Sequence, residues 1–141
     1  MFQLQIITLS GVFRDKEVFE VQVPTTAGSI VINGGHAPLV SSIKPGVLTV
    51  IYKRGDREDQ QEKVGVYEGT VEVLHNVVNI LVDEVDTPED YNEAEAEKAL
   101  ARAKEMTEKA GDSVALAEAQ SMMDRSAVRL QLASLKKRSK R

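Results

Sequence analysis

The stretch "AGSIVINGGHAPLVSSIKPG", residues 27–46, decides how this sequence is interpreted. It places His36 between two glycines and an Ala-Pro pair, in a chain with only one other histidine. Glycine accepts positive φ angles, and Pro38 holds the residue before it in an extended conformation. The stretch therefore predicts a loop of defined shape in which His36 is a hydrogen-bonding strut.

A catalytic role for His36 would need a nucleophile or an orienting carboxylate, and a metal site would need further ligands. The sequence has no cysteine, and it has none of the patterns H-x-x-H, H-E-x-x-H, G-x-S-x-G and G-x-x-x-x-G-K-[ST]. His75 lies in "LHNV", where the His-Asn pair is typical of a hairpin turn. We therefore predict no catalytic residue and no metal ligand. An activity that depends on His36 would revive the enzyme hypothesis.

Apolar residues alternate with polar ones up to about Asp86. Alternation places one side of each strand in a core and the other side toward water. Short segments separated by "SG", "KPG", "RGD" and "HN" indicate a sandwich or barrel. We predict an N-terminal β-sandwich over residues 1–86, built of about ten short strands. Its inward positions include Phe2, Leu4, Ile6, Phe19, Val21, Val23, Val71, Val73, Val78, Ile80 and Val82.

The period changes to that of a helix after Asp86. "TPED", residues 87–90, is typical of a helix start, with a hydroxyl cap, an early proline and two carboxylates. Residues 111–113, "GDS", supply a glycine stop and a new cap. We predict a C-terminal antiparallel two-helix hairpin over residues 87–141. The facing stripes are Ala96, Ala99, Leu100, Ala103, Met106 and Ala110, then Ala115, Ala119, Met122, Ser126, Leu130 and Ala133.

These stripes are mostly alanine, which permits close helix approach but buries little area. At about 25 cal/mol per Å² of apolar surface, each alanine in place of leucine gives up about 1 kcal/mol or more. We therefore expect the hairpin to be held loosely to the sandwich. It should be able to detach or extend without unfolding the strands.

The net charge of −4 is distributed unevenly along the chain. Residues 1–88 hold 7 basic and 12 acidic groups, residues 89–112 hold 4 and 8, and residues 113–141 hold 7 and 2. Only the last segment is basic, so it is either a solvated end or a contact for an acidic partner. General nucleic-acid binding is not expected. The absence of a long apolar run and of a signal-peptide start predicts a soluble, intracellular chain that can still join a membrane complex.

Two segments together carry a resemblance to a known family. "VPTTAGSIVINGGHAPLVSSIKPGVLTV", residues 23–50, is similar to a family segment of the form V-x-x-P-T-x-x-G-x-x-x-I-x-x-G-H-A-P-L-x-x-x-I-x-P-G. "VGVYEGTVEVLHNVVNILVDEV", residues 64–85, resembles the same family's glycine-containing strand pair, which ends in N-x-V-x-I-L. With the order of sandwich and hairpin, the whole chain resembles the epsilon subunit of bacterial F-type ATP synthases.

The resemblance implies a non-catalytic rotor part. Its sandwich would bind the gamma subunit and rest on the ring of c subunits, so that proton-driven ring rotation is coupled to ATP synthesis. The family's loop matching residues 27–36 faces the ring, which implies interface residues Gly28, Ser29, Gly35, His36 and Pro38. This chain departs from the family there, with Ser29 for a common acidic residue, Val31 for a glycine, and Asn33-Gly34 for an apolar-proline pair.

The family's hairpin moves between a folded-down state and an extended state that reaches the catalytic hexamer and blocks hydrolysis. This implies that Arg125, Arg129, Lys136 and Lys137 contact the beta subunit, with the alpha subunit nearby. The alternative is that these charges only keep the helix soluble. The expected location is the cytoplasmic face of a bacterial cell membrane, peripheral through the complex. The basic end and the absence of a transit peptide favour a bacterium over the alternative of a plastid or mitochondrial relative.

Some relatives bind ATP on the hairpin through an I/L-D-x-x-R-A element and two arginines. Arg125 and Arg129 match the arginines, but Asn92 replaces the aspartate and Glu95 replaces the first-helix arginine. A carboxylate beside a triphosphate is repulsive by about 1 kcal/mol even when partly solvated. We expect no cofactor and weak or no ATP binding. A generic adaptor with the hairpin as docking arm, and an ATP sensor, stay as alternative functions.

Overall fold

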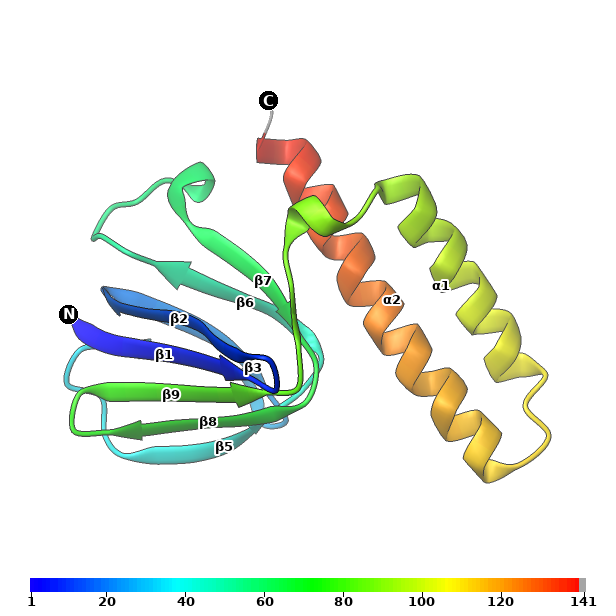
Figure 1. Ribbon diagram of the computed structural model, residues 1–141, viewed down its shortest axis with the longest axis horizontal. Helices are drawn as coiled ribbons and strands as arrows, with labels where there is room; N and C mark the ends of the chain where they lie inside the picture. Colours follow the sequence, from blue (N-terminus) through cyan, green and yellow to red (C-terminus); the bar gives the residue numbers. More distant parts are fainter. Residues whose placement is uncertain (140–141) are drawn as a thin grey trace. The chain divides into compact units, whose positions relative to one another are not determined.

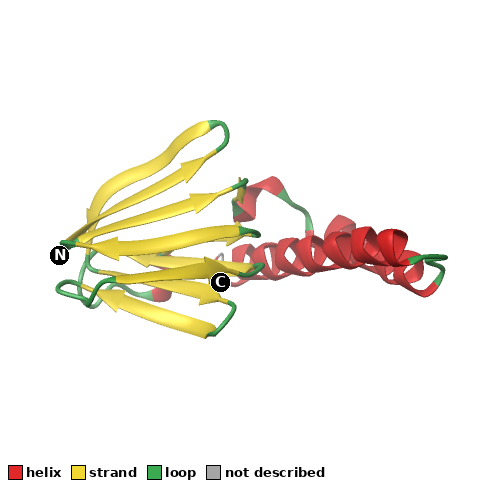
Figure 2. Cartoon of the chain, turned by 90° about the horizontal axis from the view of Figure 1, so that it is seen from below, coloured by secondary structure: helices red, strands yellow, loops and turns green. Residues whose placement is uncertain are grey.

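The computed structural model of the chain describes residues 1–139, with the side chains of the last helix described as far as Leu135 (Figure 1). The chain divides into two compact units, Met1–Asp86 and the residues from Thr87 onward. The first unit is built of strands and the second of helices (Figure 2). The predicted fold class, a β-sandwich followed by a helical hairpin, is confirmed.

Ten strands and one short 3₁₀ helix form the first unit. In chain order they are β1 Phe2–Thr8, β2 Gly11–Val18, β3 Glu20–Thr25, β4 Gly28–Asn33, β5 Leu39–Ile43, β6 Gly46–Ile51, η1 Glu58–Gln60, β7 Glu62–Val66, β8 Gly69–Leu74, β9 Val77–Val82 and β10 Val85–Asp86.

The strands form one sheet in the order β10-β7-β6-β3-β5-β8-β9-β1-β2, with β4 paired to β3 beside this path. Every pair is antiparallel except β1 with β9. Strand β3 belongs to both halves of the sheet, because residues 20–22 pair with β6 while Thr25 pairs with Ile43 of β5. The sheet thereby folds over one core.

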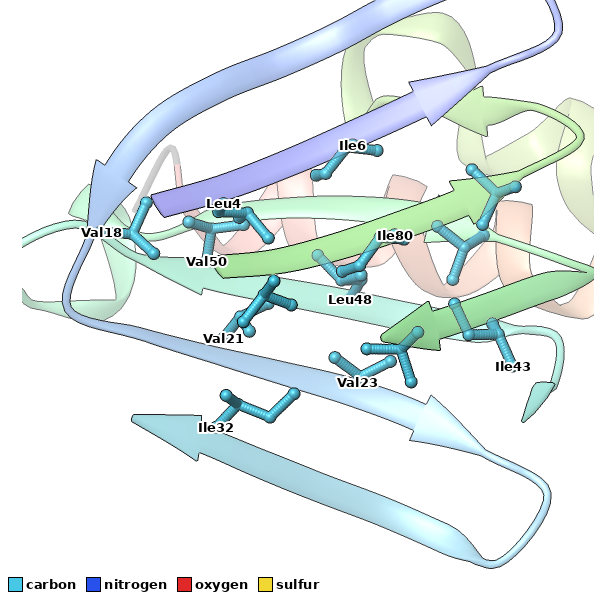
Figure 3. Close-up of a cluster of buried hydrophobic side chains, with 14 of the residues drawn as sticks. Leu4, Ile6, Val18, Val21, Val23, Ile32, Ile43, Leu48, Val50 and Ile80 are labelled. Carbon is cyan, nitrogen blue, oxygen red and sulfur yellow. The ribbon is translucent and has the colours of Figure 1, made fainter. Parts of the chain in front are cut away.

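The core is formed by the inward residues of the alternating strands. Leu4, Ile6, Val21 and Ile80 are fully buried and lie together in the close-up of this cluster (Figure 3). Full burial of such a side chain stabilises the fold by about 1.5–3 kcal/mol. Phe19 departs from the prediction. It lies between β2 and β3, outside either strand, and is only half-buried, because the chain bends there.

The predicted hairpin turn at His75-Asn76 is confirmed. Both residues have positive φ angles, 49° and 62°, and they connect the register-matched strands β8 and β9. Two positive φ angles are what a two-residue type I′ hairpin turn requires, and asparagine tolerates that conformation better than most residues.

The second unit contains the 3₁₀ turn η2 Pro88–Asp90, the helix α1 Glu93–Glu108 and the helix α2 Ser113–Ser139. The prediction that "TPED" starts the first helix was wrong. Thr87 and Asp90 close a single turn, in which the Thr87 amide donates to the Asp90 carboxylate at 2.9 Å. The chain then becomes extended at Tyr91 before α1 begins.

Asn92 explains where α1 begins. Its side-chain oxygen accepts from the amides of Ala94 at 2.9 Å and Glu95 at 3.4 Å. These are two of the four N–H groups that a helix start leaves without an intrahelical partner, so the helix is capped at this position. Asp112 does the same for α2 by accepting from the amide of Ala115 at 2.7 Å.

The two helices of the hairpin pack together through small side chains. The buried small residues recur every seven positions, namely Ala96 and Ala103 on α1 and Ala119, Ser126 and Ala133 on α2. The predicted alanine seam is therefore confirmed. Ala115, Met106 and Met122, predicted within it, are exposed instead, whereas Val128 and Leu132 of α2, which the prediction left out, are buried. Small seam residues bring helices close together, which leaves no room for long side chains between them.

Candidate functional site

The predicted interface segment, residues 27–36, is mostly a strand and not a loop. Strand β4 occupies Gly28–Asn33 and pairs with β3 along its whole length. The run Ile30-Val31-Ile32 consists of β-branched residues, which favour a strand, and Ile32 is buried. As a result Gly28 and Ser29 lie at one end of β4, while Gly35, His36 and Pro38 follow its other end, about 17 Å away at 3.3 Å per residue.

The first end of β4 is held by Thr25. This side chain is fully buried, donates a hydrogen bond to the carbonyl of Gly28 and accepts one from the amide of Ala27 at 3.3 Å. Gly28 has a φ of 112°, which side chains rarely allow. The β3–β4 turn is thereby fixed, and Ser29 is presented to solvent.

The second end of β4 carries His36. Its amide donates to the carbonyl of Asn33 at 3.3 Å, which closes a turn over the glycine pair. The exposed imidazole Nδ1 lies 2.7 Å from the carbonyl oxygen of the next residue, Ala37. His36 is hydrogen-bonded as predicted, but its bonds are local and do not tie the loop to the rest of the sandwich.

Asn76 supplies long-range support that the sequence pattern did not reveal. Its side-chain oxygen accepts from the amide of Gly35 at 2.9 Å, and its side-chain nitrogen donates to the carbonyl of Met1 at 2.9 Å. Its own carbonyl accepts from the amide of Gln3 at 3.2 Å. The only signal in the sequence was the His-Asn turn, which indicates a backbone conformation and not a partner elsewhere in the chain.

The hairpin brings together the two elements of the nucleotide-binding pattern. The guanidinium carbon of Arg129 lies 5.1 Å from the centre of the Tyr91 ring, a cation–π distance. Arg125, one helical turn before it, is half-buried, and Glu95 is exposed on the first turn of α1. Asn92 is engaged in capping. Lys136 and Lys137, the other predicted beta-subunit contacts, lie outside the part of the chain whose side chains are described.

A charged cluster joins β2, the last strand of the sheet order, to β7, which lies next to the other end. Arg14 on β2 donates to both carboxylate oxygens of Glu62 on β7, one of them at 2.9 Å, and the Tyr52 hydroxyl donates to Glu62 at 2.6 Å. Burial alone would raise the pKa of Glu62, but the hydrogen bonds from Arg14 and Tyr52 hold it below its usual value. Burial and the bond to Glu62 raise the pKa of Tyr52 to about 12. The cluster is structural, and no pattern in the sequence pointed to it.

Within residues 1–139, no group of three or more histidine, aspartate or glutamate side chains could hold a metal ion. None of the helices in that range has the length and apolar character to cross a bilayer. His36 and His75 are both exposed, and the connections that carry them adjoin through the hydrogen bond from the Gly35 amide to the Asn76 side chain. The fold and these surfaces define a two-part protein, in which a β-sandwich is followed by a small-residue helical hairpin.

Comparisons with known proteins agree with this class. Residues 1–88 match the family described as ATP synthase, Delta/Epsilon chain, beta-sandwich domain. The ATP synthase epsilon chain of Chloroflexus aggregans is 35% identical over 138 residues, covering 98% of this chain and 96% of the relative. The chloroplastic epsilon chain of Oltmannsiellopsis viridis is 32% identical over 130 residues, covering 92% and 95%. The chain therefore belongs to the family of ATP synthase epsilon chains.

Solved structures share the fold. A chain of the cryo-EM structure of the Euglena gracilis mitochondrial ATP synthase, OSCP/F1/c-ring, matches with a TM-score of 0.80 at 20% identity, over 93% of this chain and 79% of that one. A chain of the Tetrahymena thermophila mitochondrial ATP synthase, central stalk and c ring, matches with a TM-score of 0.56 at 17% identity, over 97% and 95%. Family membership confirms the prediction of a non-catalytic subunit of the ATP synthase.

Proposed function

We propose that this chain works as a rotor subunit whose sandwich docks on the c ring and on gamma and transmits ring rotation to the catalytic hexamer. The observation that carries this proposal is the fixed geometry of the candidate interface. Both ends of β4 are held by buried or long-range hydrogen bonds, through Thr25 and Asn76, while Ser29 and His36 stay exposed. A part that transmits torque must keep its shape under load, and a preorganised surface binds with less loss of conformational freedom.

The outer face of the sandwich supports the contact with gamma. Leu81 of β9 pairs with Ile7 of β1, which pairs with Val12 of β2, so one row of apolar side chains crosses three strands. Leu81 is 44% exposed and Val12 is 66% exposed. Contiguous exposed apolar side chains mark interaction sites. We assign this row to gamma and the turns around β4 to the ring.

The hairpin is proposed to restrain ATP hydrolysis by extending toward the beta and alpha subunits. Its buried residues are mostly alanine and serine, with Val128 and Leu132 as the larger buried side chains of α2. Such a hairpin buries less apolar area than one with a leucine seam, so its packed state is less strongly favoured over another arrangement. Residues 113–141 carry 7 basic and 2 acidic groups, which suits an acidic surface. Arg125, Arg129, Lys136 and Lys137 are the proposed contacts.

The proposed location follows from these partners. A chain that rests on the membrane-embedded ring lies on the cytoplasmic face of the bacterial cell membrane and is held there by the complex. The epsilon relatives include a bacterial and a chloroplastic chain. The bacterial origin therefore rests on the basic end of the chain and stays a prediction.

Reconstitution tests the function. An ATP synthase depleted of this subunit should regain proton-coupled ATP synthesis when the full chain is added, and its uncoupled ATP hydrolysis should fall. A chain without residues 113–141 should restore coupling but leave hydrolysis high. If neither form restores coupling, or if neither co-purifies with gamma and the c ring, the chain acts as a generic adaptor and the proposal is wrong.

A further inference from the structure

The surface around β4 lies in a long gap in the charge pattern. From Val21 to Ile43 there is no aspartate, glutamate, lysine or arginine, although 28% of the chain consists of these residues. A stretch of that length would hold about six of them at the chain average. The charged residues resume on either side, at Glu20 and Lys44.

The gap is a feature of the surface and not only of the core. Of the thirteen residues 26–38, all are exposed except Gly28, Ile30 and Ile32. Ile32 is buried and belongs to the core cluster (Figure 3). We call the exposed residues within 26–38 the neutral edge. It comprises the β3–β4 turn, the outward side of β4 and the His36 loop.

The neutral edge offers uncharged hydrogen-bonding groups in fixed positions. Among the described strands β4 pairs only with β3, so its other side presents backbone N–H and C=O groups. Strands at an edge are commonly protected by lysine, proline or a bulge, and β4 has none of these. The Ser29 hydroxyl and the Asn33 amide add further neutral donors and acceptors. Thr25 and Asn76 hold the two ends.

This chemistry selects the kind of partner. Anionic lipid headgroups and nucleic acids are attracted by lysine and arginine, and the bilayer interface favours tryptophan and tyrosine. Residues 26–38 contain none of these types. A charged protein surface would lose its hydration here without meeting an opposite charge, which is unfavourable. An uncharged protein segment, by contrast, can satisfy its hydrogen bonds against the edge.

We propose that the neutral edge docks a segment of the c ring that carries no charge at the contact, through backbone and hydroxyl hydrogen bonds and the exposed Val31 side chain. This inference rests on the proposed function, because it takes the ring as the partner. It adds the chemistry of the contact, which the proposed function does not specify. In this proposal the ring contact of this chain contains no ion pair. A partner with a charge at this position is excluded, because that charge would be buried against the neutral edge without an opposite charge.

The test measures the affinity of the full chain for gamma alone and for gamma assembled with the c ring. The dissociation constant for gamma alone, divided by that for gamma assembled with the c ring, isolates the contribution of the ring contact. Between about 50 mM and about 500 mM NaCl, we expect this ratio to change less than about twofold, since neutral contacts are not screened. A tenfold loss of the ratio over that range would overturn the inference.

Charge variants at Ser29 give the sharper result. Ser29→Asp and Ser29→Lys should each lower the ring-dependent ratio about tenfold or more, because either charge is buried without a partner. Ser29→Ala should change it less than about threefold. Ser10→Asp, in the exposed β1–β2 turn outside the gap, is the matched control and should leave it unchanged. Circular dichroism melting curves confirm that the variants fold.

The outcomes separate the two proposals. If either charge at Ser29 tightens ring binding, the ring carries the opposite charge there and the neutral contact is wrong. If gamma and ring bind no better than gamma alone, the proposed rotor function itself fails. If the chain sediments as a dimer that Ser29→Asp dissociates, the edge pairs with a second copy and the assignment to the ring is overturned.

Discussion

The Asn76 side-chain oxygen accepts a hydrogen bond from the amide of Gly35, 41 positions earlier in the chain, at 2.9 Å. The same carboxamide donates to the carbonyl of Met1. One side chain in a hairpin turn therefore ties the His36 loop and β1 to the β8–β9 connection. The shape of the candidate interface depends on a residue that does not belong to it.

Replacing Asn76 with glycine should loosen the His36 loop without unfolding the sandwich. Glycine keeps the positive φ of 62° but removes both side-chain hydrogen bonds. We expect amide hydrogen exchange at Gly35 to accelerate about tenfold, and the free energy of unfolding to fall by about 1 kcal/mol. His75→Gly changes the same turn and leaves the Asn76 bonds intact, so Gly35 should exchange as in the parent chain. Equal exchange at Gly35 in the two variants would disprove the role of Asn76.

The contrast between β4 and its surroundings shows what a sequence can and cannot predict here. Alternation identified the inward residues of most strands because burial imposes a period of two on the residue types. The glycines at 28, 34 and 35 suggested a loop, but the segment between them is a strand that pairs with β3 along its whole length. The hydrogen bond from the Gly35 amide to the Asn76 side chain could not be predicted, since a turn pattern carries no information about distant partners.

The Arg14–Glu62 pair is a second long-range relationship that has no sequence signature. Because the folded-state pKa of Glu62 is lowered, its ionised form stabilises the sandwich above the unfolded-state pKa of about 4.5. That contribution is lost as the pH falls through the lower, folded-state pKa. We expect the parent chain to lose stability on acidification below pH about 4.5.

Glu62→Gln should remove most of this acid dependence. At pH 7 the variant should be less stable by about 1–2 kcal/mol, since Arg14 would then donate to the single oxygen of a neutral amide and no longer to both oxygens of a carboxylate. Urea unfolding of both chains at several pH values measures the difference. The exposed Glu58, which forms an ion pair with Lys63 at 3.3 Å, provides the control variant Glu58→Gln. A Glu62→Gln chain with the same acid dependence as the parent chain would contradict the assignment.

Gly69 is required by close backbone packing between β8 and β9. An added Cβ atom would lie 2.0 Å from the carbonyl oxygen of Leu81 and 2.9 Å from the Cα of Val82. Both are backbone atoms, so the strands would have to separate. Gly69→Ala should destabilise the sandwich by about 3 kcal/mol, which lowers Tm by roughly 10–20 °C for a domain of this size.

Gly111→Ala is the control for this prediction. A Cβ atom added to Gly111, in the turn between α1 and α2, would meet no other atom within 4 Å. This replacement should shift Tm by less than about 3 °C. Equal melting temperatures for Gly69→Ala and the parent chain would show that the strand pair adjusts without strain.

The hairpin start illustrates a competition that residue preferences alone did not resolve. Thr87, Pro88 and two following carboxylates satisfy the usual preferences for a helix start, yet the helix begins only at Glu93. Asn92 prevails because its side chain accepts from two amides, whereas Thr87 closes only one turn. In the sequence Asn92 stands out only as a departure from a nucleotide-binding pattern, and the structure assigns its side chain to the cap.

ATP binding to the hairpin should be weak or absent. Arg129 lies over Tyr91, close to the segment that would meet the nucleotide, but Glu95 on the first turn of α1 opposes a triphosphate. Titration calorimetry of the full chain with ATP and Mg²⁺ should show no dissociation constant below about 1 mM. Sub-millimolar binding by the parent chain would refute this expectation.

A double variant tests whether these two residues are the cause. Asn92→Asp combined with Glu95→Arg restores the family pattern, and aspartate caps a helix as well as asparagine does. Reversing the charge at Glu95 should strengthen ATP binding by about tenfold, because repulsion becomes attraction. Glu97→Arg makes the same charge change at an exposed position on α1 outside the pattern and should have little effect. If the two variants bind ATP equally well, net charge and not the position of Glu95 governs binding.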